Sequence, residues 1–342
     1  MFELKLKIHQ YFNNKKLNKN QQKVSSQVRE SKISSVVLSG IVKLFILCFF
    51  GVVVAFPFIY MILVSFMNDG EAESLKSSFN LVPSFSSGKS YFAGKGFVFE
   101  PYWTNIVQNT YNRAITNGYW SSFALTLANV FVSVFFKVFI TSLMGYAFSL
   151  KNWKGKKIVW FIALALLVLP EVALLSGQYG VILKTKLYRT FILFVLAIAL
   201  PFSASVFNTV MYKNAFEAIP GRIKEVSLVD GATGPKYFFK IALPMVIPTT
   251  LTIVILTSLA SWNAYLWPSI ISTIGDTKFD VISVWLFRAG INPDDPESAA
   301  NVAVNVKLAA SLLVILPMFG IYLIARKWIM RAVSRQGSTI KG

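Results

Sequence analysis

The chain has 342 residues, of which 55% are apolar, 15% are aromatic and only 14% are charged. A soluble domain of this length would expose too much apolar surface, so the composition predicts a protein that lies mostly in lipid. The formal net charge of +19 makes nucleic acid a possible partner. Whether the charge indicates nucleic-acid binding depends on where the basic residues fall relative to the apolar spans.

Residues 1–35 form a basic leader that is rich in Lys, Asn and Gln and has too few apolar residues for a core. We expect a solvated, partly disordered cytoplasmic tail rather than a regulatory domain. The first apolar span, 36–66, lies behind this leader and is too long for a cleaved signal peptide. Cys48 in this span and His9 in the leader are the single cysteine and histidine, so a disulfide framework or a His/Cys metal site is excluded.

Residues 67–119 connect the first two spans. Their Ser/Gly clusters and aromatic residues favour an ordered external cap over a flexible linker. The segment 87–90 is similar to the end of a phosphate-binding loop, but Pro83 stands where that motif needs a glycine. We therefore expect no nucleotide site and no bound cofactor in this chain.

Five further apolar spans follow, each near the length of about 20 residues that crosses a hydrocarbon core of about 30 Å. They cover residues 120–150, 158–175, 191–212, 241–266 and 304–325. With the first span they predict an all-α integral membrane protein with six transmembrane helices, a core over 120–325 and a tail over 326–342.

The basic residues alternate between the two sides of these spans. Twenty-two Lys and Arg residues lie in the leader, the second and fourth connections and the tail, against nine in the other connections. By the positive-inside rule both termini are cytoplasmic. Because the charges are scattered over four segments without an aromatic platform, they fit membrane topology better than nucleic-acid binding.

Two charged residues fall inside spans at similar depth. Lys137 in the second span and Glu171 in the third lie about 21 Å from the same cytoplasmic boundary, at 1.5 Å per residue. We hypothesise that they approach each other or share a hydrated cavity, and that Pro170 breaks the third span there. The alternatives are an ion pair that fixes helix register, a role in lining the solute path, and no contact.

The fourth connection, residues 213–240, predicts a short helical hook on the cytoplasmic side. Pro220 can open a helix, and Asp230-Gly231 can end it because glycine accepts the left-handed conformation of a helix C-terminus. An apolar stripe lies at Ile223, Val226 and Val229. Thr233 and Pro235 can then start a second helix that runs into the fifth span. The alternative is an ordinary amphipathic loop at the membrane surface.

This hook resembles the cytoplasmic signature of binding-protein-dependent ABC importer permeases, which reads Glu-Ala-Ala, three residues, Gly, nine residues, Ile, one residue, Leu-Pro. Five positions are in register: Glu225, Gly231, Ile241, Leu243 and Pro244. Val226 and Ser227 replace the two alanines. Three more residues look like family positions: Asp230, Ala232 and Phe238. The resemblance implies that these residues couple the chain to an ATPase.

Two other segments resemble the carbohydrate-uptake branch of that family, the six-span maltose-type permeases. Residues 262–268 read Trp-Asn-Ala-Tyr-Leu-Trp-Pro, with Ala264 in place of the usual acid. An interfacial aromatic belt is the alternative interpretation. The C-terminus, ending in Lys341-Gly342, is similar to a tail that reaches toward the ATPase interface, with a frayed basic end as the alternative. The resemblance covers residues 120–342.

The resemblance implies a heterodimer with a second permease, two ATPase subunits that bind ATP and Mg, and an external solute-binding protein that delivers a carbohydrate. The chain itself would hold no catalytic residue and no metal. Candidate solute-path residues are Trp262, Asn263, Tyr265, Lys137 and Glu171, although in maltose-type importers the main membrane sugar site belongs to the partner permease. The alternatives are another solute, such as an amino acid or a glycan fragment, an ion-driven transporter, or a membrane enzyme.

Overall fold

The computed structural model describes residues 9–17, 33–83, 89–92, 96–99, 105–116, 118–151, 153–274, 279–291 and 302–338. The chain divides into two compact units, residues 1–60 and 61–342. Most of the predicted leader lies outside the described residues, apart from a short helix over 9–17.

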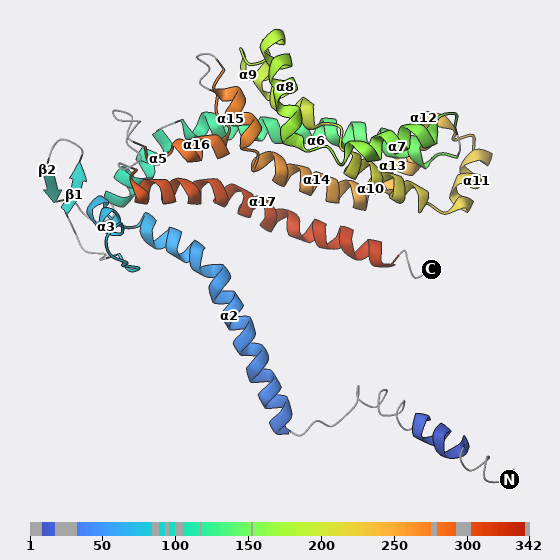
Figure 1. The fold of residues 1–342 in the computed structure, drawn as a ribbon, viewed down its shortest axis with the longest axis horizontal. Helices are drawn as coiled ribbons and strands as arrows, with labels where there is room; N and C mark the ends of the chain where they lie inside the picture. The colour runs from blue at the N-terminus through green and yellow to red at the C-terminus, as the bar shows by residue number, and fades with distance from the viewer. Residues whose placement is uncertain are drawn as a thin grey trace. The chain divides into compact units, whose positions relative to one another are not determined.

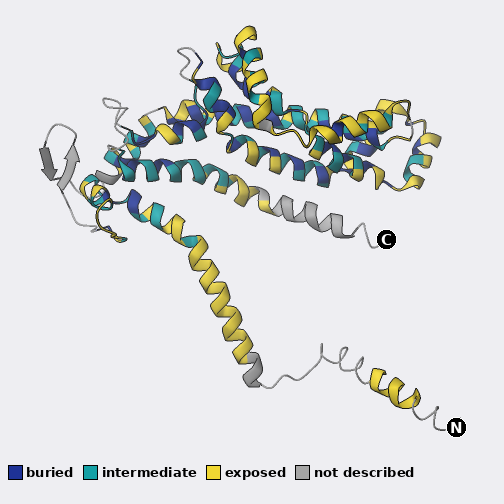
Figure 2. Ribbon diagram, in the orientation of Figure 1, coloured by how far each residue is buried: buried dark blue, intermediate teal, exposed yellow. Residues whose placement is uncertain are grey.

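Helix α2, Ile33–Ser65, covers nearly all of the first predicted span, 36–66 (Figure 1). Its 33 residues extend about 50 Å at 1.5 Å per residue, more than a hydrocarbon core of about 30 Å requires. The most apolar stretch has a mean hydropathy of 2.7, and none of it is buried within the chain. Most of α2 is therefore drawn as exposed in Figure 2, as expected of a helix whose apolar side chains face lipid or another subunit.

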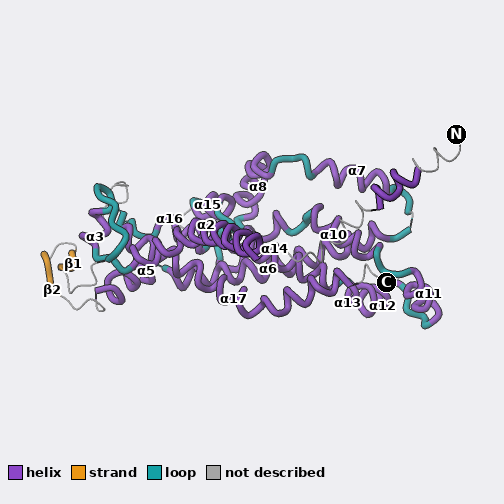
Figure 3. Tube along the Cα trace, turned by 90° about the horizontal axis from the view of Figure 1, so that it is seen from below, coloured by secondary structure: helices purple, strands orange, loops and turns teal. Residues whose placement is uncertain are grey.

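Helix α6, Tyr119–Ser149, is the central helix of the second unit and coincides with the second predicted span, 120–150. It packs against α10, α14, α9 and α16, and Figures 1 and 3 both show α10 and α14 running beside it. Helix α17, Val304–Ser338, packs against α14 and α16 and covers the sixth predicted span, 304–325. It stays helical well past the predicted boundary at 325.

The fourth and fifth predicted spans are bent rather than straight. The fourth consists of α9, Phe191–Ala199, a 3-10 turn η2, Leu200–Phe202, and α10, Val206–Glu217, with a 64° bend. The fifth enters through α12, Gly234–Tyr237, a π-helix η3, Phe238–Ala242, and α13, Leu243–Met245, then bends by 74° into α14, Ile247–Trp262. Prolines cause both breaks, because Pro201, Pro244 and Pro248 cannot donate the backbone hydrogen bond that continues a helix.

The third predicted span, 158–175, is not one helix. It is divided into α7, Lys156–Leu166, and α8, Glu171–Thr185, with Pro170 as the N-cap residue of α8. The break predicted at Pro170 is confirmed. At 11 residues, α7 is about 17 Å long and cannot cross the core alone. Within the described residues, three helices are long and apolar enough to cross a membrane, or five if each bent pair counts as one span.

The connection between the first two spans is ordered over its described residues. It contains α3, Asp69–Ser74, a π-helix η1, Asn105–Tyr111, and α5, Asn112–Thr116. A short hairpin, which the sequence did not predict, pairs β1, Lys89–Phe92, antiparallel with β2, Gly96–Phe99.

Asp69 makes an ion pair within this connection and a hydrogen bond that joins the connection to α17. Asp69 Oδ1 lies 2.6 Å from Arg113 Nη2 and accepts a 2.7 Å hydrogen bond from Asn305 Nδ2. Asn305 is almost fully buried at the start of α17, so its amide ties the connection to the sixth span.

Three buried clusters hold the second unit together. The first joins α6 to α9 and to α15, Leu266–Ser272, around Phe194 and Trp267. The second joins α6 to α17 and to α16, Ile282–Arg288, around Tyr119 and Trp262. The third joins α6 and α10 to the hook and α14 around Phe238. The hook and the cavity described below are each built on one of these clusters.

Candidate functional site

The first helix of the hook, α11, runs over Gly221–Val229 and ends at the predicted glycine. Pro220 is its N-cap residue and so lies just before the first turn. Gly231 is left-handed, with φ +66°; its N–H donates to Leu228 O at 3.1 Å, and Ala232 N–H donates to Ser227 O at 2.8 Å. This pair of bonds is the Schellman motif, and it satisfies carbonyls that the helix end would leave open.

The second half of the hook is anchored by aromatic rings. Phe238 is 4% exposed, and its ring centroid lies 4.9 Å from that of Tyr146 on α6 and 6.0 Å from that of Phe216 on α10. Ala232 is buried, Ile241 and Leu243 are half-buried, and Pro244 is exposed. The hook is therefore joined to α6 and α10 through a packed cluster rather than through a flexible loop.

Three apolar side chains are exposed on α11. Val226, Leu228 and Val229 are 59%, 63% and 88% exposed, and Glu225 and Asp230 are exposed beside them. The predicted stripe is thus divided, because Ile223 packs inward while Val226 and Val229 face outward.

Ser227, at the position of the second alanine in the family pattern, is buried, and its hydroxyl donates to Ile223 O within the same helix. A serine with its hydroxyl satisfied in this way packs much as alanine would.

Helices α6 and α10 approach closely at Gly145, where an added Cβ would lie 2.4 Å from Tyr212 Cβ. At the next residue of α10, Lys213 Nζ lies 2.9 Å from Glu217 Oε1 and 5.4 Å from the ring centroid of Trp160 on α7. These contacts fix the helix that leads into the hook.

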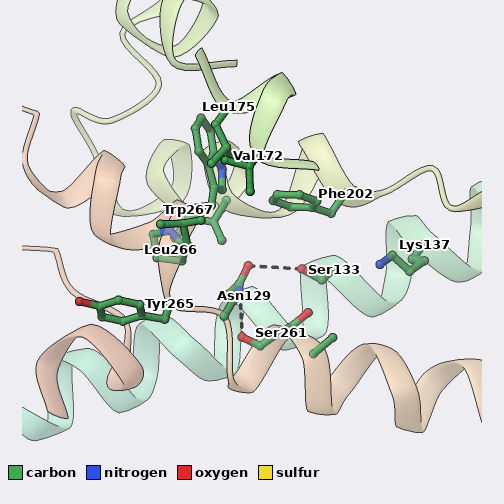
Figure 4. A pocket seen from close by; sticks show the side chains of 14 residues that line it. Asn129, Ser133, Lys137, Val172, Leu175, Phe202, Ser261, Tyr265, Leu266 and Trp267 are labelled. Carbon is green, nitrogen blue, oxygen red and sulfur yellow. Dashed lines mark hydrogen bonds between the residues drawn. The ribbon is translucent and has the colours of Figure 1, made fainter. Parts of the chain in front are cut away.

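A cavity of about 300 Å³ lies in the second unit between α6, α8, α9, α14 and α15 (Figure 4). Asn129, Ser133 and Lys137 line it from one side of α6, four residues apart. Asn129 Nδ2 donates to Ser261 O on α14 at 3.4 Å, and its Oδ1 accepts from Ser133 Oγ at 3.3 Å. Much of the remaining lining is apolar or aromatic, so a short polar row faces an apolar wall.

The structure brings together part of the predicted solute-path set. Lys137 and Tyr265 both line the cavity. The Glu171 side chain lies outside the described residues, so its approach to Lys137 stays a prediction, although the next residue, Val172, lines the same cavity.

Trp262 and Asn263 do not line the cavity. Trp262 is 3% exposed and packs in the second cluster, where its ring centroid lies 5.9 Å from that of Phe123. Asn263 is exposed, and its Nδ2 donates to Leu259 O at 3.0 Å. Trp267 is also 3% exposed and donates from Nε1 to Ala197 O at 3.1 Å. Both tryptophans are therefore core anchors and do not form an interfacial belt in this chain.

The polar residues that line the cavity beside Lys137 were not predicted from the sequence. Asn129 and Ser133 belong to a buried row of small and polar side chains along α6, namely Ser122, Thr126, Asn129, Ser133, Thr141 and Ser142. Polar residues at helical spacing in a long apolar span are a signal that could have found them. Ser261 carried no such signal.

Two other predictions concern the C-terminal tail and metal binding. Lys341 and Gly342 lie outside the described residues. Among the residues that the structure does describe, no group of three or more His, Cys, Asp or Glu side chains could hold a metal ion.

Residues 137–335 match the family model described as "Binding-protein-dependent transport system inner membrane component". The chain belongs to this family. It is therefore a membrane-embedded permease subunit of an ABC importer and not itself an enzyme, and its family implies ATPase and substrate-binding-protein partners and a place in the cytoplasmic membrane.

Curated relatives extend the similarity beyond the matched segment. The permease is 40% identical over 333 residues to the "Probable ABC transporter permease protein MG189 homolog" of Mycoplasma pneumoniae, covering 96% of this chain and 97% of the relative. It is 24% identical over 226 residues to the arabinooligosaccharides transport system permease protein AraQ of Halalkalibacterium halodurans, covering 66% and 75%. It is also 24% identical over 235 residues to the sn-glycerol-3-phosphate permease UgpE of Yersinia enterocolitica, covering 68% and 79%.

The fold is similar to that of a solved importer. The crystal structure of a bacterial ABC transporter involved in the import of the acidic polysaccharide alginate contains a chain that superposes with a TM-score of 0.66 at 19% identity. The match covers 88% of the permease and 99% of that chain. The predicted all-α membrane fold is thereby confirmed.

Proposed function

We propose that this permease is one of two membrane subunits of an importer that carries a carbohydrate received from an external binding protein. The observation that supports a carbohydrate is the cavity of about 300 Å³, which is lined both by the polar side chains of Asn129 and Ser133 and by the aromatic residues Tyr265 and Trp267. Ligand cavities combine apolar or aromatic walls with a few placed polar groups, and a sugar has both an apolar ring face and many hydroxyls. The arabinooligosaccharide permease among the relatives supports the same solute class.

Lys137 and Glu171 belong to the proposed solute path. A charged side chain in hydrocarbon costs at least about 2.5 kcal/mol unless it is paired or hydrated. Lys137 lines the cavity, where water can reach it. Glu171 begins α8, directly before a cavity residue, so we expect the two side chains to share this hydrated space.

The proposed ATPase socket is the hook together with the first residues of the fifth span. Glu225 and the exposed apolar face of α11 would meet the ATPase, while Asp230, Gly231 and Ala232 hold the helix end in shape. Phe238 and Ile241 to Pro244 carry the motion into α13 and α14. Two ATPase subunits would bind ATP and Mg, and Lys341-Gly342 is proposed to reach toward their interface.

The socket requires that both termini and the hook be cytoplasmic, as the basic residues indicate. ATP binding to the partner subunits must then reverse an equilibrium between inward-facing and outward-facing states. Moving that equilibrium from 1:99 to 99:1 takes about 5.5 kcal/mol of differential binding. A stiff hook packed through Phe238 can transmit such a bias, whereas a flexible loop would lose it.

A phosphorylated polyol is the second candidate solute. The sn-glycerol-3-phosphate permease among the relatives and the presence of Lys137 in the cavity wall favour it. ATP-dependent uptake of labelled saccharides and of sn-glycerol 3-phosphate, measured in the same membrane vesicles, separates the two solutes. Uptake that follows an ion gradient instead of ATP would contradict both.

The socket is tested by purifying the permease from its native membrane in mild detergent and identifying what accompanies it. We expect a second permease and an ATPase. Glu225→Arg and Gly231→Pro should each lose the ATPase, because one reverses a charge on the exposed face of α11 and the other cannot adopt φ +66°.

Glu73→Arg is the matched control, since Glu73 is an exposed acid on α3 in the predicted external cap. This variant should retain the ATPase. Recovery of the ATPase with both hook variants, or its absence from the unaltered protein, would overturn the proposed socket.

A further inference from the structure

A second cavity, of about 700 Å³, opens between α8, α15 and α16. It shares two lining residues, Leu175 and Tyr265, with the inner cavity. All three helices lie in or beside segments that the charge distribution predicts to be external. The second cavity, which we name the outer vestibule, therefore adjoins the inner cavity at Tyr265.

Aromatic rings form one wall of the outer vestibule. The ring centroids of Tyr265 and Phe287 lie 4.3 Å apart at an interplanar angle of 37°, and Tyr179 of α8 completes the set. Each ring covers one face of the other, but Tyr265 and Phe287 are still 40% and 55% exposed, so part of each side chain is accessible to a ligand. Such rings suit the apolar side of a sugar ring.

Hydroxyl groups lie beside these rings. Ser269 Oγ donates to Leu266 O at 2.8 Å and Thr273 Oγ1 donates to Ile270 O at 2.7 Å. A hydroxyl has one donor and two acceptor lone pairs. With their protons committed to their own helix, Ser269 and Thr273 present acceptors to the vestibule, which is what the hydroxyls of a ligand need.

Arg288 supplies donors on the same side of the vestibule. Its Nη1 lies 2.6 Å from Asp280 Oδ2, and its side chain is 56% exposed. A guanidinium carries five N–H donors in a fixed plane, so one bond to Asp280 holds the group while others remain for a ligand. Because Asp280 balances the charge, the vestibule suits a neutral ligand better than an anion, which would compete with that carboxylate.

We infer that the outer vestibule is a saccharide subsite of this subunit, which takes one neutral sugar ring against Tyr265 before the sugar enters the inner cavity. The inference rests on the proposed carbohydrate function and adds a second binding position to it. It assigns to this chain a sugar contact outside the inner cavity, with Tyr265 as the wall that both positions share.

Cysteine labelling tests the subsite without knowledge of the natural solute. Cys48 is the single cysteine, so Cys48→Ser gives a background into which Ser269→Cys is introduced. Right-side-out vesicles carrying the complete importer are treated with a membrane-impermeant maleimide. The probes are maltose, arabinobiose, glucuronate and sn-glycerol 3-phosphate.

We expect at least one neutral saccharide to slow labelling of Ser269→Cys by about tenfold at ten times its Kd, because the free fraction of the site falls to about one tenth. Ser77→Cys, an exposed position in the predicted external cap, should label at an unchanged rate. Tyr265→Phe should keep the protection, whereas Tyr265→Ala should weaken the apparent affinity on the order of tenfold, or about 1.4 kcal/mol.

ATP-dependent uptake of the same probes in the Cys48→Ser background separates this inference from the proposed function. Uptake of a saccharide without protection at Ser269→Cys, equal protection at Ser77→Cys, or full protection in Tyr265→Ala would each overturn the subsite alone. Protection only by the two anions would overturn the neutral-ligand argument. Absence of any saccharide uptake would instead overturn the proposed carbohydrate function.

Discussion

The contact between α6 and α10 makes a strong prediction for Gly145→Ala. A Cβ at this position would lie 2.4 Å from Tyr212 Cβ, 3.0 Å from the Lys213 backbone nitrogen and 3.1 Å from Thr209 O. All three atoms belong to the α10 backbone or are attached directly to it, so no side-chain rotation can relieve the contact. The two helices would have to separate.

The expected cost follows from that separation. Carbon atoms pack at about 3.5–4.0 Å, so α6 and α10 must move apart by about 1 Å and loosen the contacts on either side. Overpacking of this kind costs about 1–3 kcal/mol, and the case here belongs at the upper end because the neighbours are backbone. The better helix propensity of alanine returns about 1 kcal/mol. We expect a net loss of about 2 kcal/mol.

The assay is thermal unfolding in detergent, in which the fraction of protein that stays monodisperse is measured after heating to each temperature. A loss of about 2 kcal/mol should lower the Tm by about 3 °C, because the unfolding entropy is about 2.1 cal/mol/K per residue and the chain has 342 residues. Gly180→Ala is the matched control, because Gly180 is helical in α8 and nothing lies within 4 Å of its added Cβ. That variant should be unchanged or up to about 1 kcal/mol more stable. If both variants melt together, the close packing inferred at Gly145 is wrong.

Three further predictions concern buried polar contacts. Burial raises the pKa of Asp280 above 3.8, and Arg288 opposes this shift. The folded chain therefore binds this proton more tightly than the unfolded chain does, so the stabilisation is full below pH 3.8 and is lost as the pH rises through the raised pKa. Asp280→Asn should remove this pH-dependent part of the Tm. Trp267→Phe leaves a buried carbonyl without its donor and should lower stability by about 1–3 kcal/mol in thermal melts, whereas an unchanged Tm would show that the hydrogen bond contributes nothing net. Asn305→Ala removes the amide that bonds the Asp69 carboxylate, so limited proteolysis should cut the connection between the first two spans faster, with an unchanged cleavage rate as the contradicting result.

The positions of the bends bear on how the hook works. Along the chain, the 64° bend comes before α10, which leads into the hook. The 74° bend comes after α13, which follows the hook, and lies at Val246. Between the two bends, Phe216 and Phe238 pack together and against Tyr146 of α6. We expect this packed part to move as one body when the hook is displaced, with the two breaks absorbing the change in direction.

The sequence alone determined those features that depend on nearby residues. The ends of α11 and the start of α12 follow from Pro220, Gly231 and Pro235, because backbone conformation at a proline or glycine is decided locally. The break at Pro170 has the same cause. The membrane location follows from span length and composition, which need no knowledge of packing.

The tertiary structure decided everything that depends on which helix faces which. Trp262 and Trp267 could equally have faced lipid, a solute or the core, because a tryptophan satisfies each environment and only the neighbouring helices select among them. Asn129, Ser133 and Ser261 become one polar wall only when α6 and α14 lie side by side. Tyr265 lines two cavities because α8 and α15 border both of them. These helices are far apart in the chain, and a linear pattern does not show that they meet.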